Sequence, residues 1–168
     1  MQFRLQEYEG SRFVTVDISL SDNSLTLNYN LSGLNNVVWQ DPSDVPCRKD
    51  ELWRHTCLEL FIGEPGNKRY AELNLSPSGD WQSYHFDDYR DGMTLSNELL
   101  VERIAADAES KQLSAMVRMN IDIDPLLLGP AAVIEFTDGN LHYFALEHGK
   151  QPDFHQRAFY IQTPRNHL

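Results

Sequence analysis

A chain of 168 residues fits one compact domain and is short for two ordinary ones, so we expect a single domain over residues 1–168. Hydrophobic residues make up 41% of the chain and aromatic residues 11%, which suffices for a packed core and argues against general disorder. The formal net charge of −11 repels phosphate backbones and anionic lipid headgroups, and it therefore disfavours nucleic acid and membrane surfaces as partners.

The start of the chain and its cysteines predict a cytoplasmic location. Residues 1–7 hold no apolar run and no small-residue cleavage site, although a chain trimmed of a leader would look the same. No later stretch approaches the roughly 20 apolar residues that span a bilayer. Cys47 and Cys57 are too few for a disulfide-stapled fold; free thiols are favoured, and a bridge between them stays open.

Apolar and polar residues alternate with a period of two in the first part of the chain, which is typical of half-buried strands. One run covers residues 14–20 and the next covers residues 25–31. Ser21, Asp22 and Asn23 between them are turn residues, so the two runs predict a β-hairpin. A loop-like stretch follows, from Ser32 to about Leu52.

Short strand-like runs separated by Gly, Pro, Ser and Asn continue to the end of the chain. The expected strands cover residues 57–62, 70–75, 81–86, 99–105, 112–119, 132–136, 141–148 and 158–162. One short helix is expected at residues 124–129, where Asp124 would cap it, Pro125 would open it and Gly129 would end it. The pattern predicts an all-β fold, an antiparallel β-sandwich with at most one short helix.

Two of the expected strands place polar side chains together. Strand alternation directs Leu58, Leu60 and Ile62 to the core and sends Glu59 to the opposite face, and in the next strand Glu72 and Asn74 face outward in the same way. If the two strands pair, the two carboxylates and the amide share one outer face, with aromatic residues beside them. The same residues are also compatible with a solvated strand face.

Carboxylates, amides and an exposed indole together are suited to a sugar. Carboxylate and amide groups exchange hydrogen bonds with hydroxyls, and an aromatic face covers the apolar C–H side of a pyranose ring. Trp53, six residues before Glu59, is the candidate stacking residue. The alternative is that Trp53 is a core residue at the entry of a strand.

Several segments of the sequence resemble the DOMON-like superfamily, and in particular its branch akin to family 9 carbohydrate-binding modules. These segments are residues 52–59 (LWRHTCLE), 76–81 (SPSGDW), 89–93 (YRDGM) and 151–155 (QPDFH), together with the Tyr-x-Glu-x-Asn strand at residues 70–74. A group of small stand-alone bacterial DOMON-like proteins is similar over most of the chain. The resemblance implies a β-sandwich, also described as a jelly roll, that holds a sugar between two aromatic side chains.

Carried over by position, the resemblance implies that Trp53 stacks on the sugar and that Glu59, Glu72 and Asn74 hydrogen-bond to it. The relatives commonly supply a second stacking Trp from a late strand, but residues 142–146 read HYFAL here. Phe144 or Trp81 would then take that role.

Other site chemistries have weaker support. His148, Asp153 and His155 are candidate metal ligands without a diagnostic spacing. Haem is held by Met and His in other DOMON relatives, but nothing fixes such a pair here, so haem is not expected. Paired glutamates are also the tools of glycosidases, which need one raised pKa in a desolvated pocket, and an outward sheet face does not promise that.

We therefore expect a non-catalytic domain that binds a small saccharide or a related hydroxyl-rich molecule, with no assigned catalytic residue and no required cofactor. The alternative is a module that uses the same aromatic and acidic face, with Arg54 and Arg90 nearby, against a protein partner. The sequence names neither the sugar nor the oligomeric state.

Overall fold

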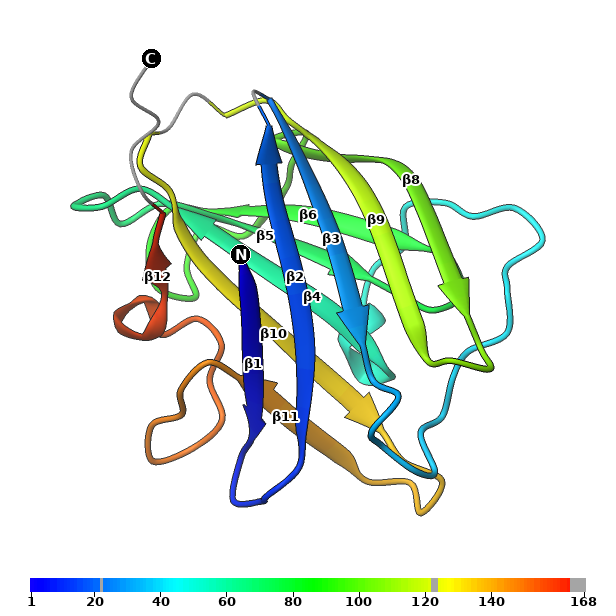
Figure 1. Ribbon diagram of the computed structural model, residues 1–168. Helices are drawn as coiled ribbons and strands as arrows, with labels where there is room; N and C mark the ends of the chain where they lie inside the picture. Colours follow the sequence, from blue (N-terminus) through cyan, green and yellow to red (C-terminus); the bar gives the residue numbers. More distant parts are fainter. Residues whose placement is uncertain (22, 122–123, 164–168) are drawn as a thin grey trace.

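The computed structural model describes the chain except for residues 22, 122–123 and 164–168 (Figure 1). Within the described residues the structure is almost entirely β, and its helical elements are two 3-10 turns at Leu52–Arg54 and Arg157–Phe159. The strands are β1 (Gln2–Glu7), β2 (Phe13–Ser21), β3 (Ser24–Asn30), β4 (Cys57–Gly63), β5 (Tyr70–Leu75), β6 (Trp81–Phe86), β7 (Thr94–Leu95), β8 (Leu99–Asp107), β9 (Gln112–Met119), β10 (Leu127–Glu135), β11 (Leu141–Ala145) and β12 (Ile161–Gln162).

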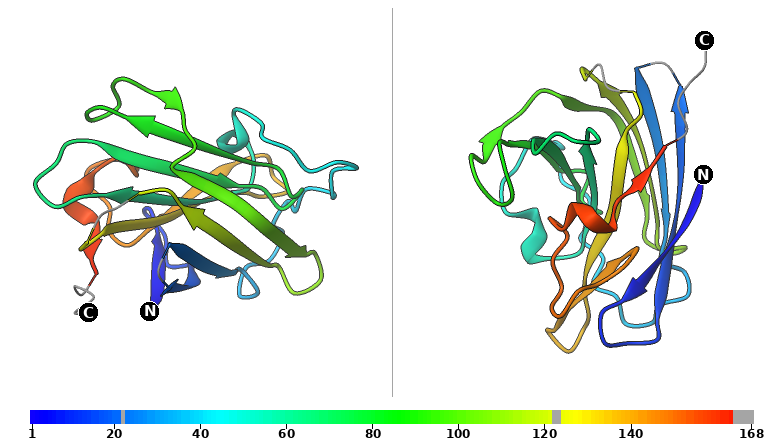
Figure 2. Two further views of the ribbon diagram at one scale, coloured as in Figure 1. Left: turned by 90° about the horizontal axis from the view of Figure 1, so that it is seen from above. Right: turned by 90° about the vertical axis from the view of Figure 1, so that its left-hand side faces the viewer.

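The strands join in one curled sheet with the order β7-β6-β5-β4-β10-β11-β1-β2-β3-β9-β8, and β12 pairs with β10 outside this path. Neighbouring strands in this order pair antiparallel. The sheet folds over on itself, so that the layer of β1, β2, β3, β9 and β8 lies against the layer of β4, β5 and β6 (Figures 1 and 2). The predicted all-β antiparallel class is confirmed.

The main core fills the space between the two layers. Ile18 and Leu27 from one layer and Leu60 and Leu73 from the other belong to the same buried cluster. A polar tie also crosses this core: the hydroxyl of Tyr29 on β3 donates a hydrogen bond to the backbone carbonyl of residue 59 on β4, at 2.5 Å. Since Tyr29 is itself buried, this bond fixes the position of β4 relative to the opposite layer.

Strand β10 changes partners along its length. It pairs with β4 from Leu127 to Val133, whereas on its other side Leu127 and Leu128 pair with β12 and residues 131–135 pair with β11. Pro130, which has no N–H to donate, lies between these two stretches. The proline therefore occupies the place in the strand where a ladder hydrogen bond is least needed.

The short helix expected at residues 124–129 is wrong, because Leu127 begins β10 and the strand is buried over residues 128–134. A short apolar run next to a proline does not distinguish a helical turn from a buried strand. The N-terminal strand β1 was not expected at all, although its Leu5 is fully buried. No helix in the described part of the chain is long and apolar enough to cross a bilayer.

Candidate functional site

The candidate site lies on the face of β4 and β5 that points away from the main core. On this face Glu59 pairs across the strands with Asn74, and Phe61 pairs with Glu72. Glu59 and Glu72 are therefore diagonal neighbours, a spacing of about 7–8 Å between backbones that long side chains can bridge. The expected grouping of Glu59, Glu72 and Asn74 on one face is thus present in the structure.

The face is covered by protein, which corrects the expectation that it points to solvent. Glu59, Glu72 and Asn74 are only 3%, 5% and 0% exposed. The cover is the chain between β11 and β12, whose Phe154 contacts the ring of Phe61 with centroids 6.4 Å apart. Strand alternation predicts on which side of the sheet a residue lies, but it cannot predict whether another segment of the chain packs on that side. Buried carboxyl groups are costly, so their presence here points to function.

The covering segment is anchored at its C-terminal end. Tyr160 packs on Phe61 and against Gly129, where a Cβ atom would collide with the tyrosine ring. The Tyr160 hydroxyl donates to the backbone carbonyl of Phe154 at 2.8 Å, and the guanidinium of Arg157 donates to the carbonyl of Glu64 at 2.6 Å. These contacts hold the covering segment against the sheet.

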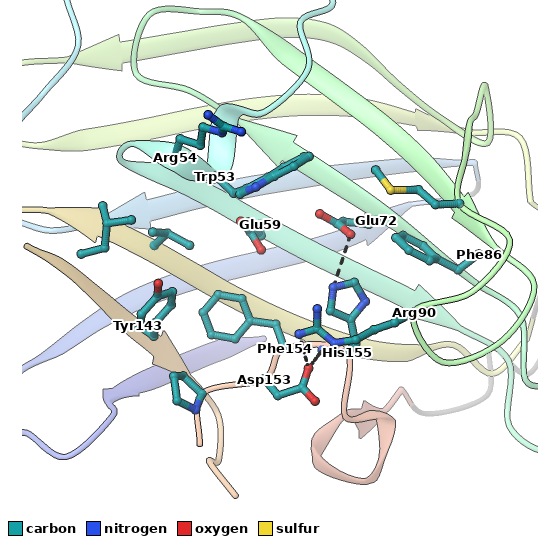
Figure 3. Close-up of a pocket in the computed structure, with 14 residues that line it drawn as sticks. Trp53, Arg54, Glu59, Glu72, Phe86, Arg90, Tyr143, Asp153, Phe154 and His155 are labelled. Carbon is teal, nitrogen blue, oxygen red and sulfur yellow. Dashed lines mark hydrogen bonds and ion pairs between the residues drawn. The ribbon is translucent and has the colours of Figure 1, made fainter. Parts of the chain in front are cut away.

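Between the sheet and its cover lies a cavity of about 440 Å³ (Figure 3). Its floor is the strand face, one side is the 3-10 turn at Leu52–Arg54, and the other sides are the loop after β6 and the covering segment. The lining residues are Trp53, Arg54, Glu59, Glu72, Phe86, Arg90, Met93, Val133, Leu141, Tyr143, Pro152, Asp153, Phe154 and His155.

Aromatic side chains form much of the wall. Trp53 is partly exposed and meets the ring of Tyr84 edge-on, with centroids 5.9 Å apart. The Tyr84 hydroxyl is in turn tied to Asp50 at 2.9 Å, which positions the ring that supports the indole. On the facing side Tyr143 and Phe154 pack edge to face at 6.0 Å. An indole and two further rings thus face the same space as the two glutamates.

An ion pair links two sides of the cavity. The guanidinium of Arg90, on the loop after β6, lies 2.7 Å from the carboxylate of Asp153 on the covering segment. The hydroxyl of Tyr89 donates to the same carboxylate. These hydrogen bonds hold the pKa of Asp153 below its usual value despite the desolvation that opposes the shift. Asp153 therefore stays ionised and fastens the cover to the loop.

His155 is held as a neutral ring. The Tyr70 hydroxyl accepts a hydrogen bond from the backbone N–H of Arg90 at 3.1 Å, so its own proton is free to go to the His155 Nδ1, 2.6 Å away. With Nδ1 as acceptor, the ring proton lies on Nε2, which points toward the Glu72 carboxyl at 4.0 Å (Figure 3). Burial, aided by the Arg90 charge, lowers the pKa of His155 to about 4.

The two glutamates resist ionisation. Burial raises the pKa of Glu72 to about 7, although a hydrogen bond from Asn74 and the nearby Arg90 charge oppose the shift. Burial also raises the pKa of Glu59 well above its usual value, and the neighbouring Glu72 charge adds to the effect. Near neutral pH the pair therefore retains at least one proton, and the cavity floor can both donate and accept hydrogen bonds.

Asn74 lies on the same face, opposite Glu59 and two residues from Glu72, and it is completely buried. Its Nδ2 donates to the Glu72 carboxylate at 3.0 Å, while its Oδ1 has no hydrogen-bond partner among the described residues. This residue orients Glu72, and it does not line the cavity itself.

The structure brings Trp53, Glu59 and Glu72 to one cavity, but it does not bring Trp81 or Phe144 there. Phe144 is fully buried in the main core, and Trp81 packs against that core under the guanidinium of Arg48. The neighbouring Tyr143, on the opposite face of β11, reaches the cavity instead. Phe154, which comes from the covering segment, was not expected at the site, whereas Arg54 and Arg90 were expected near this face and both line the cavity.

The candidate metal ligands do not gather. The Nε2 of His148 lies 2.7 Å from the backbone carbonyl of Gln6, whereas Asp153 and His155 line the cavity. The described residues contain no group of three or more His, Cys, Asp or Glu side chains arranged to hold a metal ion. Cys47 is exposed, Cys57 is buried, and both are free thiols.

Comparison with known proteins shows a likeness in fold. No protein-family model and no curated protein matches the chain. A crystal structure from Bacteroides uniformis ATCC 8492, described as a "putative carbohydrate-binding protein", superimposes with a TM-score of 0.68. The match covers 95% of this chain and 84% of the other at 14% sequence identity. The fold is therefore shared with a solved β protein.

Proposed function

We propose that this protein binds a small hydroxyl-rich molecule, most simply a mono- or disaccharide, without transforming it. The observation behind this proposal is that two buried carboxyl groups, Glu59 and Glu72, form the floor of an aromatic-walled cavity of about 440 Å³. Ligand pockets for small molecules usually measure about 300–1,000 Å³ and combine apolar walls with a few polar groups. The cavity matches that description in size and composition.

Each part of the cavity has a role in this proposal. The Trp53 indole, with Phe154 or Tyr143 on the facing side, would cover the apolar C–H faces of a sugar ring. The protonated carboxyl of the Glu59–Glu72 pair would donate to a sugar hydroxyl, and the ionised one would accept from another. The structural relative's description as carbohydrate-binding supports the same ligand class. We also retain the DOMON-like resemblance and the single-domain organisation as proposals.

The proposal is tested with a glycan array followed by titration of the tryptophan fluorescence. Small saccharides offer little apolar surface, so we expect dissociation constants between about 1 μM and 1 mM. Trp53→Ala should weaken binding by about 2 kcal/mol, or roughly thirtyfold, because it removes the stacking surface. Trp81→Phe is the matched control, since Trp81 lies outside the cavity, and it should leave the dissociation constant unchanged.

Two results would contradict the proposal. One is the absence of binding to any glycan on the array together with a stable protein partner that occupies the Trp53 face, which would favour the interaction module. The other contradicts the part of the proposal that assigns stacking to Trp53: a Trp53→Ala variant that is destabilised by roughly 3–5 kcal/mol, as for a core aromatic residue, while an array-positive saccharide still binds. Thermal unfolding of each variant distinguishes lost binding from lost folding.

Hydrolysis of a glycosidic bond is a second candidate, favoured by one observation. The structure provides what a general acid requires, a glutamate with a pKa of about 7 in a desolvated cavity beside a second carboxyl. Incubation with a panel of nitrophenyl glycosides tests it. Release of nitrophenol by the native protein but not by Glu72→Gln would establish hydrolysis, whereas release by both would point to a contaminating enzyme.

A further inference from the structure

We propose that the ligand of this cavity is an amino sugar, bound with its ammonium group at Glu59 and Glu72 and its ring against Trp53. This inference deepens the saccharide-binding function proposed above and rests on it. It follows from the pairing of charges around the cavity, from the aromatic walls and from the burial of the two carboxyls.

Each cation at the cavity is already matched by an anion outside the glutamate pair. Arg90 is held by Asp153 at 2.7 Å, and Arg54 is held by the exposed Glu51, also at 2.7 Å. His155 contributes no charge, because its Nδ1 accepts from Tyr70 and its ring is buried. Arg90 does lower the pKa of Glu72, yet its own partner is Asp153. Among the described residues lining the cavity, no cation is therefore left for the two glutamates.

The two carboxyls lack strong donors of their own. Glu72 accepts from the neutral amide of Asn74 and faces His155 at 4.0 Å, beyond hydrogen-bond distance. The hydrogen-bonding group beside the Glu59 carboxyl is the thiol of Cys57, a weak donor. A carboxyl that is at most 5% exposed and so poorly paired would gain most from a ligand that brings a charge.

The walls of the cavity also favour a cation. Ring faces attract ammonium groups through their quadrupole, and the attraction strengthens where water is excluded. Trp53, Phe86, Tyr143 and Phe154 all line the space above the carboxyls. Rings and carboxylates around a desolvated space are suited to an ammonium group, which can pair with both carboxyls in their ionised form, while a neutral hydroxyl would leave one of them protonated.

Binding of a cation has a proton signature. The ligand's charge should ionise the pair, so the protein should release about one proton at pH 7 when an ammonium group enters. The titratable groups on the sheet near the pair are Tyr29 on β3, Cys57 on β4, Tyr70 on β5 and Tyr84 on β6. Arg54 and Arg90 lie beside the cavity, and Asp153, His155 and Tyr160 lie on the cover. The thiol and the four phenols have raised pKa values and stay neutral at pH 7.

The test is isothermal titration calorimetry at pH 7 with hexosamines of the gluco, galacto and manno series, each beside its parent hexose and its N-acetyl derivative. At least one hexosamine should bind tenfold or more tightly than both neutral analogues. Repeating the titration in two buffers of different ionisation enthalpy should show the release of about one proton for the hexosamine and none for the hexose. N-acetylation keeps the ring and removes the charge, so it isolates the ammonium group.

Glu72→Gln supplies the matching protein variant. It keeps the shape and the hydrogen bond from Asn74 but removes one charge, so the preference for the hexosamine over its parent hexose should fall toward one. Glu109→Gln, at an exposed turn far in sequence from the cavity residues, should keep the native preference. Denaturation curves confirm that both variants are folded.

The outcomes separate this inference from the proposed function. Equal or tighter binding of the neutral hexoses overturns the ammonium inference and leaves saccharide binding standing. A preference for hexosamine that survives Glu72→Gln without proton release also overturns it. If no saccharide binds here or on the glycan array, the proposed function itself fails.

Discussion

Replacing Glu72 by Gln should make the protein more stable at alkaline pH. The amide has nearly the shape of the protonated acid and can still accept the Asn74 hydrogen bond of 3.0 Å. It cannot ionise, however, and so it avoids the cost of placing a negative charge in a site that is 5% exposed. The variant therefore removes the free energy of ionising this carboxyl together with its repulsion of Glu59.

The sign and size of the expected stability change follow from the raised pKa of Glu72. Glu72 titrates at about 7 in the folded protein against 4.5 ordinarily, so between these values the folded state holds a proton that the unfolded state has lost. Native stability must then fall as pH rises through this window and level off above it. The shift corresponds to a cost of about 3 kcal/mol, of which about 2 kcal/mol should develop between pH 5 and pH 8.

The assay is urea denaturation of the native protein and of Glu72→Gln at pH 5, 6.5 and 8. His155 imposes the opposite trend, because its lowered pKa makes the fold lose stability as pH falls from 6.5 toward 4. That trend is common to both proteins and cancels when their free energies of unfolding are subtracted. The free energy of unfolding of Glu72→Gln, relative to that of the native protein, should rise by about 2 kcal/mol from pH 5 to pH 8. Glu109→Gln, at an exposed position, should show no such movement.

Parallel stability curves for the native protein and Glu72→Gln would refute the reasoning. They would mean that Glu72 ionises in the fold as easily as in the unfolded chain. The carboxyl would then have a partner that compensates its charge, and both the retained proton and the ammonium inference would lose their basis.

Two further predictions concern packing. Phe144→Ala should cost about 3–5 kcal/mol of stability because Phe144 is fully buried. Phe154→Ala, at the partly exposed cavity wall, should cost less stability and should weaken saccharide binding. Urea denaturation measures the stability of each variant, and fluorescence titration measures its binding. Gly129→Ala should cost about 1–3 kcal/mol by pushing Tyr160 and its segment off the sheet, while Gly33→Ala, with open space around its Cβ, should be neutral in the same assay.

The strands with strict alternation and clear turns were predictable from the sequence. The bounds of β5, β6 and β9 agree with the expected ranges at both ends. The expected strand at residues 158–162 is reduced to Ile161–Gln162, because a 3-10 turn extends through Phe159, and the one at 141–148 ends at Ala145. These segments form the cover, where contacts with the sheet decide the backbone and no repeating pattern is required.

The sequence was enough to predict the glutamates on the cavity floor, but it was not enough to predict the residues of the cavity walls. Alternation places Glu59 and Glu72 on one face, but it cannot show that a segment some 80 residues later crosses that face with Phe154 and His155. The error at Trp81 could have been avoided: Trp81 pairs with Leu75, which was already expected to face the core. Phe144 and Tyr143 point to opposite faces because successive residues of a strand alternate.

The order of strands in the sheet differs from their order of synthesis, and this bears on how the protein is made. Strand β4 needs β10 as its neighbour and β1 needs β11, so the growing chain must hold its first half with open edges until residue 145 has been synthesised. Pairings between such distant segments form slowly and leave edges that attract other chains. The cavity is completed last, once Asp153 has emerged from the ribosome and can reach Arg90. A nascent or truncated chain that stops before this point would carry two uncovered glutamates on an incomplete sheet, and it would be a substrate for chaperones and proteases before it could bind a ligand.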